Sequence, residues 1–243
     1  MNELSLHALH QELGARFANV NGMEVVEHYG DPSAEYTALR QSAGIIDLGC
    51  RGRLCLRGVD RQRLLHGQVT NNVKDLEVGE GCYAALVTAK GKMQSDLNIY
   101  CLPEEFLLDF EPGFSAAIGQ RFEKYIIADD VQVIDIGSHY GLLSVQGPKA
   151  GSVIQNLEMD LKLPAQLLSF SSTKDLTLGE IYCMNQPRGQ TLGFDLFVPS
   201  AALRAVADKL MLAVKAPMFK EPAAEQAVTR NLASPRRSGF EES

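Results

Sequence analysis

The segment from Met93 to Cys101 alternates strictly between two kinds of side chain. One side of the segment carries Met93, Ser95, Leu97, Ile99 and Cys101, and the other carries Gln94, Asp96, Asn98 and Tyr100. A period of two is typical of a half-buried β-strand, because successive side chains of a strand point to opposite faces. One face therefore belongs to a core, while the other sets a carboxylate, two amides and a phenol in a row at intervals of about 6.7 Å. The chain must build a sheet here, and the polar face of that sheet is either washed by solvent or lines a binding site.

The composition is that of an ordinary globular protein. The chain has 243 residues, of which 45% are hydrophobic and 22% charged, and this length suits one large domain or two smaller ones. No apolar run approaches the roughly 18 residues that a membrane span needs. The N-terminus has no basic region followed by an apolar region, so we expect no secretory signal and a cytoplasmic location. The formal charge of −7 and the lack of a Lys/Arg cluster argue against DNA binding.

The sequence gives little indication of a metal or disulfide site. Its five cysteines are scattered and form no C-x-x-C pair, which argues against a disulfide framework and a structural zinc site. His7 and His10 share one face of a helix expected over residues 4–18, but no carboxylate or cysteine partner is evident for them. We therefore expect the cysteines to be core thiols and expect no metal.

The order of predicted elements indicates an α+β fold with two related halves. Residues 53–136 predict a strand, a helix, three strands, a helix and a strand, which resembles a split β-α-β unit with an extra strand. The pattern restarts near Gly141, where a strand, Gly147 and a helix parallel the strand, Gly58 and helix of the first unit. Residues 217–243 hold three prolines and few apolar side chains, so we expect a loosely ordered tail there.

The residues alone leave the role of the polar strand face open. A solvated sheet face is the ordinary interpretation. The face has no Lys, Glu or Thr, however, and Asp96 lies in mid-strand, where Asp is depleted. Lys90 and Lys92, in the turn before the strand, are either ordinary exposed residues or a cationic rim that attracts an anionic ligand.

Several segments, taken in order, resemble the folate-binding aminomethyltransferase family. Its members include the T-protein of the glycine cleavage system and the YgfZ-type folate-binding proteins. The resemblance is carried by residues His10–Phe17, Glu35–Arg40, Gly44–Asp47, Leu56–Asp60, His66–Asn71, Ala89–Met93, Ser95–Tyr100 and Val145–Ala150.

The resemblance implies two interleaved split β-α-β-type lobes. They comprise residues 1–48 plus 138–216, and residues 49–137, followed by the divergent tail at 217–243. It further implies a site for tetrahydrofolate or a one-carbon derivative of it. By this resemblance Asp96 is the catalytic position and holds the folate nitrogen, and Asn98 and Tyr100 shape the pocket. Asp195, in the segment Gly193-Phe194-Asp195, would accept the adjacent N–H donors of the pterin.

The chain also departs from the family. Ser95 stands where the transferases have the first Asp of a pair, and residues 188–192 replace an aromatic and acidic stretch. Residues 90–93 resemble the YgfZ type, whose cysteine motif is absent. The resemblance therefore implies a tetrahydrofolate-binding protein of the YgfZ type that supports iron–sulfur protein maintenance and tRNA modification, with iron–sulfur proteins as partners. The alternatives are a folate-dependent aminomethyltransferase or demethylase that uses Asp96, and a degenerate, non-catalytic interaction module.

Overall fold

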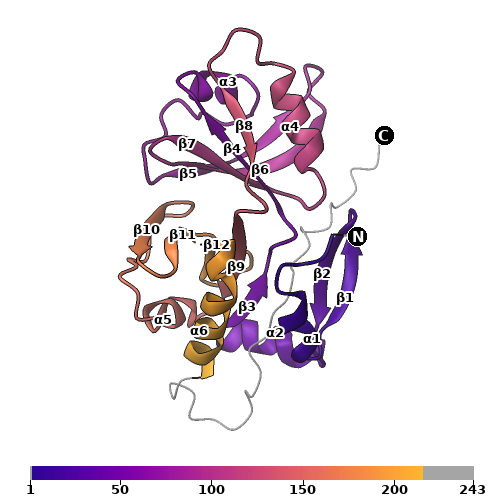
Figure 1. Ribbon diagram of the computed structural model, residues 1–243, viewed down its shortest axis with the longest axis vertical. Coiled ribbons are helices and arrows are strands. Elements are labelled where there is room, and N and C mark those ends of the chain that lie inside the picture. Colours follow the sequence, from indigo (N-terminus) through magenta and orange to yellow (C-terminus); the bar gives the residue numbers. More distant parts are fainter. Residues whose placement is uncertain (1, 216–243) are drawn as a thin grey trace.

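Two five-stranded antiparallel sheets make up most of the protein (Figure 1). The computed structural model describes residues 2–215, so the predicted loosely ordered tail at 217–243 lies outside the described residues. The first sheet has the order β10 (Phe170–Asp175), β11 (Gly179–Asn185), β12 (Gly193–Pro199), β9 (Tyr140–Gln146) and β3 (Gly44–Asp47). The second sheet has the order β5 (Gly81–Val87), β6 (Met93–Cys101), β7 (Glu105–Phe110), β4 (Gly52–Arg57) and β8 (Gln132–Asp135).

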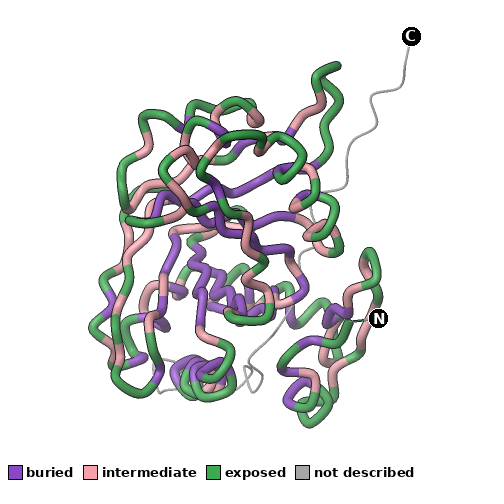
Figure 2. Tube along the Cα trace, turned by 45° about the horizontal axis from the view of Figure 1, so that its top comes forward, coloured by how far each residue is buried: buried purple, intermediate pink, exposed green. Residues whose placement is uncertain are grey.

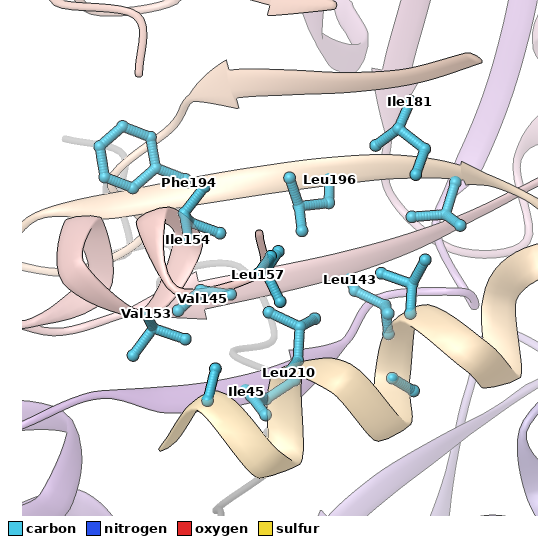
Figure 3. Packing of buried hydrophobic residues seen from close by; sticks show 14 of the residues in the cluster. Ile45, Leu143, Val145, Val153, Ile154, Leu157, Ile181, Phe194, Leu196 and Leu210 are labelled. Atoms are coloured by element: carbon cyan, nitrogen blue, oxygen red, sulfur yellow. The ribbon is translucent and has the colours of Figure 1, made fainter. Parts of the chain in front are cut away.

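Helices cover the outer face of each sheet, and the inner faces pack against each other. The first sheet is covered by α5 (Ala150–Gln155) and by α6 (Leu203–Lys215), which follows a 3₁₀ turn at Ser200–Ala202. The second sheet is covered by α3 (Arg61–His66) and α4 (Ser115–Glu123). Figure 3 shows Val153, Ile154 and Leu210 of the helices packed on Leu143 and Leu196 of the first sheet. The layers are therefore helices, sheet, sheet and helices, and Figure 2 shows many of the buried residues in the middle of the molecule.

Four of the five strands are arranged alike in the two sheets, which confirms the predicted α+β fold of two interleaved halves. In each sheet three consecutive strands, β10–β12 or β5–β7, lie beside the strand that precedes them in the chain, β9 or β4. The next position is held by β8 in the second sheet and by β3 in the first. The strand β3 comes before the second sheet in the chain, and β9–β12 come after it. The first sheet is therefore built from two segments that flank the second sheet in sequence.

Two glycines occupy equivalent junctions between strand and helix. Gly58 follows β4 with φ +104°, and Gly147 follows β9 with φ +127°, a backbone region that other residues rarely adopt. A Cβ at Gly58 would lie 2.0 Å from the Asp130 carbonyl oxygen, and one at Gly147 would lie 2.4 Å from that of Ser42. Both junctions thus need glycine for conformation and for space, which explains the repeated pattern in the sequence.

The strand β6 has the predicted bounds and the predicted alternation. Leu97, Ile99 and Cys101 enter the outer core beneath α3 and α4. Met93, at the hairpin end of the same face, is half exposed instead. Asn98 and Tyr100 of the other face are buried as well, because that face packs against the first sheet. The ordinary interpretation of a solvated polar face is therefore wrong for these two residues.

The predicted N-terminal helix over residues 4–18 is correct only at His7–Glu12 and is wrong on both sides of that segment. The helix α1 covers only His7–Glu12, and Gly14 with φ +76° follows it. The chain then forms a hairpin of β1 (Arg16–Val20) and β2 (Met23–His28). Asn21 and Gly22 both have positive φ in its two-residue turn, as the favoured Asn-Gly hairpin turn requires. A further helix, α2 (Pro32–Gln41), begins after Asp31, whose side chain accepts a hydrogen bond from the Ser33 N–H.

Candidate functional site

The layer between the two sheets divides into an apolar part and a polar part. The apolar part includes Cys55 and Leu107 of the second sheet and Ile46, Leu142 and Met184 of the first. We call the whole set of side chains between the sheets the inter-sheet layer. Its polar part is built by residues on the inner faces of β6, β7, β9 and β12 and in the adjoining loops, and it contains three of the four predicted site residues.

Asp96 lies on β6 with its side chain half-buried. The Tyr83 hydroxyl, on the neighbouring strand β5, donates a hydrogen bond of 2.8 Å to Asp96 Oδ2. Partial desolvation of the hydroxyl and its hydrogen bond to the Asp96 carboxylate raise the pKa of Tyr83 to about 12, although the residue as a whole is 55% exposed. Tyr83 therefore stays protonated at neutral pH and holds one oxygen of Asp96 in a fixed direction. Lys90 and Lys92 are exposed in the hairpin turn that leads into β6.

Asn98 joins the two sheets. Its Nδ2 donates a hydrogen bond of 2.9 Å to Asp109 Oδ2 on β7, and its Oδ1 lies 3.5 Å from Gln186 Nε2 at the end of β11. Asn98 is buried, as expected for a side chain with partners on both sides. The residue is thus held firmly and exposes little surface in this arrangement.

Tyr100 lies deep in the inter-sheet layer and has no solvent exposure. Its ring makes edge contacts with Phe170 and Phe197 of the first sheet, at centroid distances of 6.3 and 6.2 Å. Its hydroxyl has no hydrogen-bond partner among the described residues, and the same is true of Gln186 Oε1. Burial, with the charges of Asp195 and Asp109, raises the pKa of Tyr100 well above its ordinary value. Buried polar atoms without partners are rare in folded proteins.

Asp195 is paired with an arginine from the loop before its own strand. Arg188 Nη2 lies 2.5 Å from Asp195 Oδ2, and Arg188 Nε lies 3.0 Å from the same oxygen. The Ser144 hydroxyl on β9 donates a hydrogen bond of 2.6 Å to Asp195 Oδ1. Gln146 supports the arrangement, since its Nε2 donates to Ser144 Oγ at 2.8 Å and its Oε1 accepts from the Arg188 backbone N–H at 2.9 Å.

The same arginine also binds a second buried aspartate, which belongs to the other sheet. Arg188 Nη2 lies 3.1 Å from Asp109 Oδ2, and Arg51 Nε lies 2.6 Å from Asp109 Oδ1. We refer to Arg51, Asp109, Arg188 and Asp195 as the ion network. It contains two positive and two negative side chains, so its formal charges balance between the sheets.

The two aspartates of the ion network titrate differently because they have different numbers of cations. Burial alone would raise the pKa of Asp109, but Arg51 and Arg188 together lower it to about 2. Burial raises the pKa of Asp195, and repulsion from Asp109 adds to this effect while Arg188 opposes it. Burial would lower the pKa of Arg188, but Asp195 and Asp109 outweigh it and raise that pKa.

The structure thus brings Asn98, Tyr100 and Asp195 into one polar region, with Asp96 further along the same face of β6. Arg51, Asp109 and Gln186 were not predicted from the sequence, and Arg188 was noted only as part of a departure from the family. Asp109 carried a usable signal, because it stands in a strand of otherwise apolar residues, like the mid-strand Asp96. The sequence carries no such signal for Arg51 and Arg188, because their partners are distant in the chain.

The hydrogen-bonding groups around β6 suit a reduced folate, although Asn98 and Tyr100 are buried, whereas the acceptor sites of Asp195 are already occupied. The Asp96 carboxylate accepts a hydrogen bond from Tyr83, and Tyr100 and Gln186 offer buried polar atoms that need partners. A pterin edge needs carboxylate lone pairs, however, and those of Asp195 are taken by Arg188 and Ser144. The predicted pterin contact with Asp195 therefore requires Arg188 to move.

One groove lies apart from the inter-sheet layer. An open groove of about 500 Å³ is lined by Glu123, Ile126 and residues 131–134, next to the edge strand β8. Within residues 2–215 no three His, Cys, Asp or Glu side chains are placed to hold a metal ion, and no helix is long and apolar enough to cross a membrane.

The N-terminal histidines do have carboxylate partners, contrary to the sequence analysis. His7 Nδ1 lies 2.6 Å from Glu24 Oε2, and His10 Nε2 lies 2.8 Å from Asp47 Oδ2. The Tyr29 hydroxyl lies 2.7 Å from His10 Nδ1. Each histidine is thus held in the packing of the N-terminal hairpin, with its partner far away in sequence.

Comparisons with known proteins agree on one family. The family described as the GCVT N-terminal domain matches residues 6–226. A probable aminomethyltransferase of Halobacterium salinarum is 32% identical over 61% of this chain and 43% of its own length. An aminomethyltransferase of Listeria monocytogenes is 26% identical over 88% of this chain and 59% of its own length.

Solved structures show the same fold. The glycine cleavage system aminomethyltransferase T of Bartonella henselae has a TM-score of 0.76 at 23% identity, over 86% of this chain and 56% of that one. The heterotetrameric sarcosine oxidase of Corynebacterium sp. U-96 has a TM-score of 0.59 at 15% identity, over 90% of this chain. The chain spans about half the length of the aminomethyltransferases that it resembles.

Proposed function

Because the chain belongs to the GCVT N-terminal domain family, we propose that it binds a reduced folate, tetrahydrofolate or a one-carbon derivative, at the polar part of the inter-sheet layer. Asp96, Asn98 and Tyr100 would surround the ligand, and Asp195 would accept the pterin edge once Arg188 releases it. The observation that carries the proposal is that two of the eight unpartnered buried polar atoms within residues 2–215, Tyr100 Oη and Gln186 Oε1, belong to side chains of this layer. A ligand with several N–H donors and a carbonyl group supplies partners to both.

Asp96 is the residue in this set best placed to handle a proton. Its carboxylate is half-buried, and Tyr83 occupies Oδ2, so Oδ1 can accept a hydrogen bond or a proton from a ligand nitrogen. A bound reduced folate would supply the nitrogen atoms that carry a one-carbon unit. The similarity to aminomethyltransferases supports a transferase, or a related demethylase, in which Asp96 would act at that nitrogen.

The serine at position 95, where the transferases have an aspartate, favours binding over turnover. Ser95, which replaces the first aspartate of the family's pair, is buried on the outer face and hydrogen-bonded to the Asp96 carbonyl oxygen. Together with the likeness of residues 90–93, this supports the proposal that the protein is a YgfZ-type folate binder within the family. By that narrower proposal it supports iron–sulfur proteins and tRNA modification and acts in the cytoplasm.

A calorimetric titration with tetrahydrofolate tests the proposal. We expect saturable binding by the wild type and a loss of affinity of at least about threefold in Asp96→Asn, because the neutral amide is a weaker acceptor. The control is Asp208→Asn, which removes an exposed carboxylate from α6 and should leave binding unchanged.

Two outcomes would redirect the proposal. Saturable binding that is equal in wild type and Asp96→Asn removes Asp96 from the site. No binding, together with no rise in melting temperature at millimolar folate, supports the non-catalytic interaction module instead. Transfer of a one-carbon unit from a methylamine to tetrahydrofolate, if observed, identifies the transferase.

A further inference from the structure

Arg188 occupies the carboxylate on which the proposed pterin contact depends. Asp195 is buried, and the Arg188 side chain is only 10% exposed. Arg188 Nε lies within 3.2 Å of both Asp195 oxygens, and Nη2 lies 2.5 Å from Oδ2. With the Ser144 hydroxyl on Oδ1, these contacts use nearly all of the roughly four acceptor sites of a carboxylate.

The guanidinium and the pterin edge present the same donor pattern. A guanidinium offers parallel N–H groups in a planar fork, which matches the two oxygens of a carboxylate. The ring N–H of a pterin and its adjacent amino group form a comparable planar pair of donors. The two groups are therefore alternatives at Asp195, and both cannot fill the same acceptor sites.

We propose that Arg188 is an internal competitor for the pterin and sets the affinity of the site for reduced folates. This inference rests on the proposed folate site and specifies what limits binding there. Arg188 holds Asp195 when no ligand is bound, and a ligand that binds through Asp195 must displace the guanidinium.

The surroundings of Arg188 permit such a displacement. Its backbone N–H is held by Gln146 Oε1, so the start of the side chain stays fixed while the guanidinium turns. Nη2 already lies 3.1 Å from Asp109 Oδ2, so the arginine keeps a buried carboxylate partner after it leaves Asp195. The loop that carries it includes the exposed residues Gly189, Gln190 and Leu192. The cation thus remains inside the ion network, and only its contact with Asp195 is exchanged.

A titration with ligand fragments tests this competition directly. The probes are 6-methyltetrahydropterin, which has the pterin edge, and p-aminobenzoylglutamate, which lacks it. In Arg188→Gln a short neutral amide replaces the guanidinium. We expect this variant to bind the pterin fragment at least about fivefold more tightly than wild type does. The affinity for p-aminobenzoylglutamate should not change, and the gain for the pterin should vanish in Arg188→Gln/Asp195→Asn.

Further variants separate competition from a general loosening of the structure. Arg53→Gln removes another buried arginine, one whose guanidinium donates to the Leu48, Gly49 and Gly137 carbonyl oxygens, and it should leave pterin affinity unchanged. If Arg188→Gln does not fold, as judged by circular dichroism, then Arg188→Lys decides the question, because it keeps the charge and loses the fork. We expect Arg188→Lys to bind the pterin at least about twofold more tightly.

The possible results distinguish this inference from the proposed function. Unchanged or weaker pterin binding in the folded arginine variant, with normal tetrahydrofolate binding by wild type, overturns the competition and leaves the folate site in place. Failure of wild type and all variants to bind any folate or fragment overturns both. Pterin binding that appears only in Arg188→Gln supports the competition most strongly.

Discussion

The outer and inner faces of the same two sheets differ sharply in composition. The outer faces, beneath the helices, carry apolar side chains such as Leu196 and Ile181 of the first sheet and Leu108 and Phe110 of the second. The inner faces carry fewer buried apolar residues, and they also hold the ion network and unpartnered polar atoms such as Tyr100 Oη. Burial of ions costs free energy unless their partners are complete. The outer faces therefore stabilise the fold, whereas the inner faces hold buried charged and polar groups that are not needed for stability.

Truncation of an outer-face residue should give the largest loss of stability. Phe122 of α4 is fully buried in the outer core of the second sheet, and Phe122→Ala should reduce the free energy of unfolding by about 3 to 5 kcal/mol. Urea denaturation followed by circular dichroism measures this loss. Ile127→Ala is the control, because Ile127 is 92% exposed and should change stability by less than about 0.5 kcal/mol.

The same experiment tests whether the two sheets unfold together. The inter-sheet layer joins them through apolar contacts and ions, so a single transition is expected in Phe122→Ala as in wild type. Two separate transitions would show that the inner faces contribute little to cohesion, which would weaken the comparison between inner and outer faces.

A smaller and pH-dependent effect is expected on the inner face. The pKa of Asp109 falls from its ordinary 3.8 to about 2 in the folded protein, so the ionised carboxylate favours folding. This contribution is present above pH 3.8 and is lost as the pH falls toward 2, and it amounts to about 2 kcal/mol. Asp109→Asn should therefore be less stable than wild type by about 2 kcal/mol at pH 7, with the difference shrinking toward zero near pH 2.

Asp208→Asn is the matched control for that titration. Asp208 pairs with Arg204 on the exposed surface of α6, where an ion pair contributes little. A stability difference between Asp109→Asn and wild type that stays constant from pH 7 to pH 2.5 would contradict the role given to the two arginines. In that case the loss would come from packing and not from charge.

Much of this fold was predictable from local patterns, whereas the pairings of its inner faces were not. Alternation in residues 93–101 predicted the bounds of β6 and its outer face, and the repeated glycine junctions predicted two related halves. The N-terminal hairpin was also signalled, by Asn21-Gly22, although the spacing of leucines before it favoured a longer helix. Local patterns suffice for these elements because each depends on a few adjacent residues.

The ion network depends on residues that only the folded chain brings together. Arg51 and Asp109 are 58 positions apart, and Arg188 and Asp109 are 79 apart. No regular spacing in the sequence connects such residues, so the sequence alone does not predict the ion-pair partners of Arg188. The family resemblance indicated Asp195 as a ligand contact but could not show that an arginine of this chain already holds it.

The smallest expected change in stability comes from the hydroxyl group of Tyr100. Because that hydroxyl is buried and unpartnered, Tyr100→Phe should leave the free energy of unfolding unchanged or raise it by up to about 1 kcal/mol. Tyr29→Phe is the matched control, because it removes a hydroxyl that is bonded to His10 outside the proposed site and should cost about 1 kcal/mol. Urea denaturation of both variants measures these differences.

The same pair of variants connects stability with ligand binding. If the Tyr100 hydroxyl is buried without a partner because it serves a ligand, Tyr100→Phe should weaken tetrahydrofolate binding severalfold while the protein becomes no less stable. Tyr29→Phe should do the reverse, with lower stability and unchanged affinity. A clear loss of stability in Tyr100→Phe with unaltered folate affinity would mean that the hydroxyl serves packing of the inner face. The distinction between a stabilising outer face and a functional inner face would then not hold at this residue.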